Sequence, residues 1–104
     1  MKKTYKFEND NGIFISFLDY VSEDDFSSFL AFLSAKMSIP RPLITVSPYS
    51  LIAEFEFRGA ILDASYDTDA GCSLRIPPDS ELSAEAVIGL CYGEGNLRPP
   101  QGVW

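Results

Sequence analysis

The chain of 104 residues contains no histidine, only two cysteines and no long apolar segment. The absence of histidine excludes the Ser-His-Asp and Cys-His arrangements that activate nucleophiles, and it removes the commonest metal ligand. Neither the G-x-x-x-x-G-K-[ST] loop that binds phosphates nor the G-x-G-x-x-G dinucleotide motif occurs. We therefore expect no enzymatic activity, no cofactor and no metal.

The two cysteines, Cys72 and Cys91, lack the spacing of metal sites, and each lies in an apolar stretch. Buried free thiols that behave as small hydrophobic groups are the favoured interpretation. A disulfide between them stays open as an alternative.

Cations are scarce as well: eight Lys and Arg stand against fifteen Asp and Glu, which gives a net charge of -7. Such a charge repels nucleic-acid phosphates and anionic membranes, and it speeds association with basic partners. No apolar run approaches the roughly 20 residues of a membrane span, and no apolar core follows the N-terminal lysines as in a signal peptide. We expect a cytoplasmic protein that binds neither nucleic acid nor membranes.

The residues that are abundant predict a folded domain, because apolar residues make up 46% of the chain, including eight Phe and five Tyr. This content suffices for one domain, residues 1–104, with a core of its own. The segment 92–104 is rich in Gly and Pro, and we expect an extended C-terminal tail that packs on its own domain or on a neighbour.

Hydrophobic periodicity predicts the order ββαββββα, an α+β domain with two helices packed on an antiparallel meander sheet. Strand 13–18 is apolar on both faces, so we expect it to be central and covered on two sides. The expected strands are 5–7, 13–18, 43–46, 51–57, 61–66 and 72–76, and the expected second helix is 83–91.

The first helix begins at Ser22, an N-cap candidate, and Pro40 ends it. Three acids, Glu23 to Asp25, occupy its first turn, where the helix dipole favours negative charge. Phe32 lies off the apolar stripe, so it either widens the core or marks a contact surface.

Segment 51–66 is typical of a β-hairpin, with Gly59-Ala60 as its two-residue turn. This turn would pair Phe57 with Leu62 and Phe55 with Ala64 on the inner face.

The same register places Glu56 opposite Asp63 on the outer face, with Glu54 two residues along. Like charges directly opposite each other destabilise a sheet. Extending the register across the next turn places Arg75 opposite Asp63, where its charge would neutralise the pair, and Arg58 is a second candidate cation.

Two further acids, Asp67 and Asp69, follow in the turn before Gly71. This turn lacks the third oxygen ligand and the final Glu of an EF-hand, so it is a polar turn and no calcium site. A sugar hydrolase that pairs Glu56 with Asp63 is disfavoured, since an open sheet face offers little concavity.

The excess negative charge on this face is either a solvated surface or a partner-binding site. Its candidate partner-binding residues are Glu54, Glu56, Asp63, Asp67 and Asp69.

In size, charge and expected location, the chain is similar to bacterial immunity proteins, which inhibit partner toxins that are often basic nucleases. The resemblance implies an inhibitor of a basic partner protein. Immunity proteins share no common fold, so the resemblance assigns no site residues. The alternative is a self-associating structural or subunit domain without catalytic activity.

Overall fold

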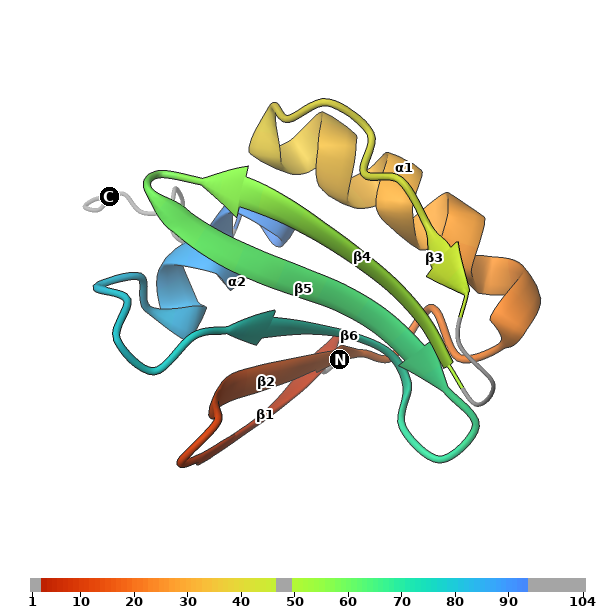
Figure 1. Cartoon of the computed structure of the whole chain (residues 1–104), viewed down its shortest axis with the longest axis horizontal. Helices are drawn as coiled ribbons and strands as arrows, with labels where there is room; N and C mark the ends of the chain where they lie inside the picture. Colours follow the sequence, from red (N-terminus) through yellow and green to blue (C-terminus); the bar gives the residue numbers. More distant parts are fainter. Residues whose placement is uncertain (1–2, 47–49, 94–104) are drawn as a thin grey trace.

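The computed structural model describes residues 3–46 and 50–93 (Figure 1). The element order confirms the predicted ββαββββα arrangement and adds a short 3-10 turn, η1, before the first helix. The elements are β1 (Thr4–Asn9), β2 (Gly12–Phe17), η1 (Glu23–Asp25), α1 (Phe26–Met37), β3 (Thr45–Val46), β4 (Ser50–Phe57), β5 (Ala60–Asp67), β6 (Gly71–Ile76) and α2 (Ala84–Tyr92).

The six strands form one antiparallel sheet in the order β1-β2-β6-β5-β4-β3. Strands β3 to β6 are the predicted meander, and the N-terminal hairpin joins it by pairing β2 with β6. Both helices lie on the same side of the sheet, as Figure 1 shows, and share one core with it. We call the opposite side the open face, because no described helix covers it.

Strand β2 is an interior strand, as predicted, and residues 3–46 and 50–93 contribute no second layer over its other face. Ile15 and Phe17 are buried toward the helices. On the open face, Phe14 is half-buried and stacks against Phe7 of β1, with ring centroids 5.0 Å apart. A neighbouring aromatic side chain therefore shields the second face of β2.

Helix α1 buries the apolar stripe predicted for it against the sheet and α2. The centre of the Phe32 ring lies 5.4 Å from that of Tyr20 and 5.5 Å from that of Tyr92, so this half-buried residue widens the core. The buried residues of α1 are Phe26, Phe29, Leu30, Leu33 and Met37.

The start of the first helical segment is held by Asp25. Its Oδ2 accepts hydrogen bonds from the backbone N–H groups of Val21 and Ser22, each at 3.1 Å. These bonds lower the pKa of Asp25, because they stabilise its charged form. Ser22 is the N-cap of this segment, as predicted, and Asp25 of the acidic first turn caps the same end.

Most element boundaries differ from the predictions by one or two residues, and three of the differences have structural meaning. Strand β3 is limited to Thr45–Val46, shorter than 43–46, because only these two residues pair with β4. Helix α1 ends where Ser38 adopts a left-handed conformation (φ 57°), before Pro40. Tyr92, the first residue of the predicted tail, belongs to α2, and 94–104 lie outside the described residues.

None of the helices within residues 3–46 and 50–93 is both long enough and apolar enough to cross a membrane.

Cys72 and Cys91 are both buried free thiols, as the favoured interpretation held. Burial raises the pKa of Cys72 to about 12 and that of Cys91 to about 11, against an ordinary thiol value of 9.0. Both side chains therefore stay protonated and unreactive in the folded protein at neutral pH.

We predict that stability falls as the pH rises above 9. Between pH 9 and 11 the unfolded chain releases the thiol protons while the folded chain retains them. The free energy of unfolding therefore falls as the pH rises. The loss should be about 1 kcal/mol per thiol at pH 10, measured by urea unfolding. Cys72→Ala should lessen this pH dependence, and an equally steep decline in that variant would contradict the assignment.

Candidate partner-binding face

The β4–β5 hairpin turns at Arg58-Gly59, and the predicted turn at Gly59-Ala60 is wrong. Both central residues have positive φ, 53° for Arg58 and 84° for Gly59, as in the type I′ turn that matches the twist of paired strands. The predicted turn would require Ala60 to take the second of these strained positions. The Arg58 guanidinium also lies 4.8 Å from the centre of the Phe57 ring, which holds the turn.

This turn changes the predicted partners across the hairpin. Glu54 lies opposite Asp63, whereas Glu56 lies opposite Ile61. The shift amounts to two residues, so each side chain keeps its predicted face. On the inner face, Phe57 pairs with Ala60, Phe55 with Leu62 and Ala53 with Ala64, in place of the predicted pairs.

Five strands contribute one side chain each to a row that crosses the open face. Starting at the β1 edge, each member lies directly opposite the next. The row therefore runs from an aromatic end to an acidic end, with one cation in the middle. Its members in order are Phe7, Phe14, Arg75, Asp63 and Glu54.

Arg75 neutralises Asp63, as the register across the Asp67–Gly71 turn predicted. Its Nε lies 2.8 Å and its Nη2 2.6 Å from Asp63 Oδ2. A third bond, 2.8 Å from Nη1, goes to the backbone oxygen of Asn11 in the β1–β2 turn. The Asp63 side chain is only 18% exposed, so this carboxylate is mainly a structural partner of Arg75.

Glu54 and Glu56 are the exposed carboxylates of the open face. Within the described ranges, neither forms an ion pair with a lysine or arginine. Both line a cavity of about 500 Å³ between β4 and the segment that leads to β3, where Arg41 and Arg58 also lie. Their charges thus remain available to a partner.

Asp67 has a structural role in the β5–β6 turn. Its Oδ1 accepts hydrogen bonds from the backbone N–H groups of Asp69 (2.9 Å) and Ala70 (2.7 Å). Asp69 is exposed beside it. Of the five predicted partner-binding residues, the structure brings Glu54, Glu56 and Asp63 together on the open face and leaves Asp67 and Asp69 at one end of it.

The aromatic end of the row was missed by sequence reasoning. Phe7 and Phe14 were assigned to strands, but only the β2–β6 pairing connects them with Arg75. Next to the row lies a second one with three small side chains at its centre, Ser16, Ser73 and Ser65. The hydroxyl oxygens of Ser65 and Ser73 are 3.3 Å apart. The alternation of side chains along a strand predicts which face each one occupies. It cannot predict the register between strands that are distant in the sequence, which forms these rows.

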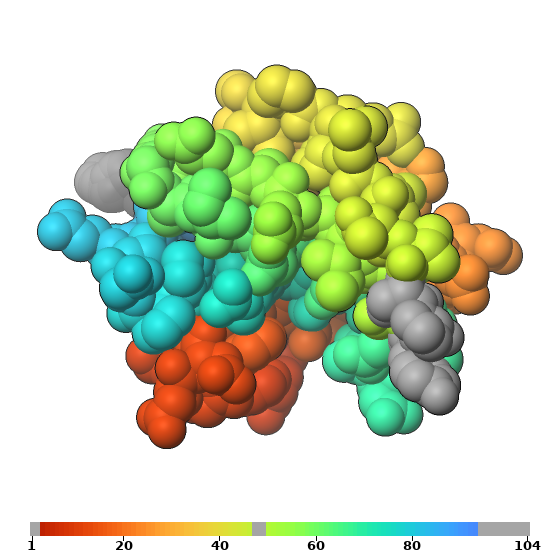
Figure 2. Space-filling view, in the orientation of Figure 1, coloured from red at the N-terminus to blue at the C-terminus, as the bar shows by residue number. Residues whose placement is uncertain are grey.

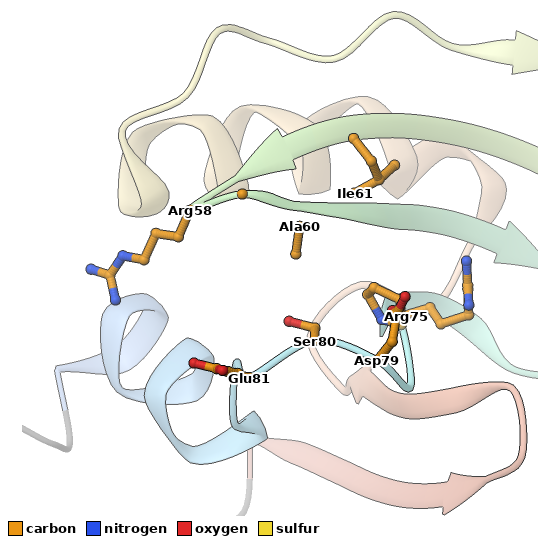
Figure 3. Close-up of a pocket in the computed structure, with 9 residues that line it drawn as sticks. Arg58, Ala60, Ile61, Arg75, Asp79, Ser80 and Glu81 are labelled. Atoms are coloured by element: carbon orange, nitrogen blue, oxygen red, sulfur yellow. The ribbon is translucent and has the colours of Figure 1, made fainter.

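A second cavity, of about 530 Å³, lies beside the turn of the β4–β5 hairpin, between Arg58–Ile61 and the segment 77–81 (Figure 3). Arg58 and Arg75 line it, but Figure 3 shows their side chains pointing in opposite directions, away from the space between them. The two cations therefore do not converge on an anion. In the part of the chain that the structure describes, no group of three Cys, Asp or Glu side chains could hold a metal ion.

Comparison with known proteins adds no assignment: no family model, no curated protein and no solved structure matches this chain.

We predict that Arg75→Met lowers the free energy of unfolding by about 2 kcal/mol, because it leaves the Asp63 carboxylate largely buried without its donor. Asp63→Asn should have a smaller effect, since it removes the charge together with the need for a cation. Lys3→Met, which breaks the exposed Lys3–Asp19 pair, is the matched control and should change stability by less than about 0.5 kcal/mol. Urea unfolding followed by circular dichroism measures all three, and equal effects of Arg75→Met and Lys3→Met would contradict the role of Arg75.

Proposed function

We propose that the chain is a small acidic binding module that inhibits a basic partner protein, as an immunity protein neutralises its toxin. One observation carries the proposal: Glu54, Glu56 and Asp63 share the open face of the sheet, and Arg75 is bound to Asp63 beside them. A bacterial, cytoplasmic setting belongs to this proposal.

The charges on this face support binding to a cationic surface. Asp63 is neutralised by Arg75, so the unpaired charge is concentrated on Glu54 and Glu56, both exposed. Carboxylates presented by a strand can occupy positions that phosphates take on a basic protein, and the net charge of -7 steers such a protein toward the module. Covering the cationic site of a nuclease in this way would exclude its substrate.

The alternative, a self-associating domain, is favoured by a different part of the surface. Leu43 is 87% and Val46 75% exposed beside the outer edge of the sheet. An exposed apolar edge can pair with a second copy. Phe32 gives this alternative little support, because it is partly buried and its ring packs against Tyr20 and the core. Light scattering distinguishes the two functions, since the binding module is expected to be a monomer.

We predict that the immobilised chain captures a basic protein from a lysate of its source, and that purified samples of the two associate in a salt-dependent manner. The association rate should fall about tenfold between 50 and 500 mM salt, because steering is electrostatic. The double variant Glu54→Gln/Glu56→Gln should lower this rate several-fold at low salt. Stopped-flow or biolayer measurements give the rates.

The matched control is Glu23→Gln/Asp24→Asn, which removes the same charge from exposed positions in η1. It should change the rate much less, because these residues lie outside the sheet. A partner that is itself acidic, or two double variants with equal effects, would contradict the proposed face.

A further inference from the structure

The open face has an aromatic half that the proposed acidic contact does not use. Tyr5 is 53% and Phe7 46% exposed, and both lie on β1 at the edge of the sheet. Phe14 on β2 stacks against Phe7 with an angle of 11° between the rings. In Figure 2 the β1–β2 hairpin (red) and the β4–β5 hairpin (green) both reach the surface.

Stabilisation of the hairpin does not account for this exposure. A stacked aromatic pair contributes about 0.5–1.5 kcal/mol to strand pairing, and the contact between Phe7 and Phe14 provides that. Tyr5 lies opposite the small Ser16 and keeps about half of its surface exposed. Exposed aromatic side chains next to one another are typical of binding surfaces.

The aromatic and acidic halves lie in a fixed relation to each other. Neighbouring strands are about 4.8 Å apart, so Phe14 and Glu54, three strands apart in the sheet, are separated by about 14 Å. Phe7 and Glu54, four strands apart, are separated by about 19 Å. A single protein surface can therefore contact both halves at once.

The strip between the halves can be covered by a partner without a charge conflict. Arg75 is held there by Asp63 on one side and by the Asn11 carbonyl on the other. Ser73 beside it is 9% exposed, and its hydroxyl lies 3.3 Å from that of Ser65. These side chains are small or already bonded, so the strip offers little that would repel a basic protein.

We infer that the open face binds its basic partner in two parts, with an apolar side chain of the partner on Tyr5, Phe7 and Phe14 and a cation on Glu54 and Glu56. The inference rests on the proposed function and adds the chemistry of the partner: a basic protein that presents an apolar group about 14–19 Å from its cations. Charge complementarity at the acidic half selects such a protein over a second copy of this acidic chain.

Two synthetic peptides test the inference by NMR titration of the labelled protein. The first is acetyl-Lys-Ser-Lys-Gly-Ser-Phe-Ser-Phe-amide, in which lysine and phenylalanine are three to seven residues apart, or about 10–24 Å when extended. The second has serine in place of both phenylalanines. The aromatic peptide should bind at least about fivefold more tightly, an advantage of the size expected for one good apolar contact, and shift resonances of both halves.

Four variants show which residues cause the tighter binding of the aromatic peptide. Phe7→Thr and Tyr5→Thr should each abolish it without weakening the polar peptide, and Tyr5→Thr does so with the Phe7–Phe14 stack intact. Glu54→Gln/Glu56→Gln should weaken both peptides. Val21→Thr, which changes an exposed apolar residue outside the strands, is the control and should change neither affinity.

Equal affinities for the two peptides would overturn the inference, and so would an aromatic advantage that survives both Phe7→Thr and Tyr5→Thr. In either case a shift of the Glu54 and Glu56 resonances by the polar peptide would leave the proposed function standing. Failure of both peptides to shift any resonance of the open face would overturn the proposed function as well.

Discussion

The pairing of β2 with β6 is the constraint on which the rest of the structure depends. It joins the N-terminal hairpin to the meander and so brings Phe14 beside Arg75. The approach of the two strands is close at one point: a β-carbon at Gly12 would lie 2.2 Å from the carbonyl oxygen of Ile76. Gly12 also has a φ of 128°, a region that other residues rarely adopt. Only glycine therefore allows the hairpin to enter the sheet in this register.

Arg75 connects the same parts through its side chain. It lies on β6, binds the carboxylate of Asp63 on β5 and donates to the Asn11 carbonyl in the β1–β2 turn. The opposition of Asp63 and Glu54 would destabilise an isolated β4–β5 hairpin. In the complete sheet, Arg75 neutralises the carboxylate of Asp63 and leaves that of Glu54 exposed. The meander and the N-terminal hairpin thus determine together how much negative charge the open face presents.

The sequence predicted the element order, the face of each hairpin residue and the Asp63–Arg75 pair, because these follow from local periodicity and short turns. It misplaced the β4–β5 turn, since a single glycine at position 59 fits either of two adjacent turns and only the positive φ of Arg58 decides between them. It could not reveal that Phe7 and Phe14 share a row with Asp63, because the β2–β6 pairing joins segments about 60 residues apart, a register that local pattern does not define.

In the proposed complex, the two halves of the open face would contribute in different ways to binding. Exposed charges such as Glu54 and Glu56 act over a distance, so they raise the rate of encounter and are screened by salt. The aromatic side chains of β1 and β2 act only on contact, when water leaves their surface, and such contacts mainly slow dissociation. A module with the acidic half alone would bind many basic proteins briefly. The adjoining aromatic half would give a means to retain one of them, as the proposed inhibitor requires.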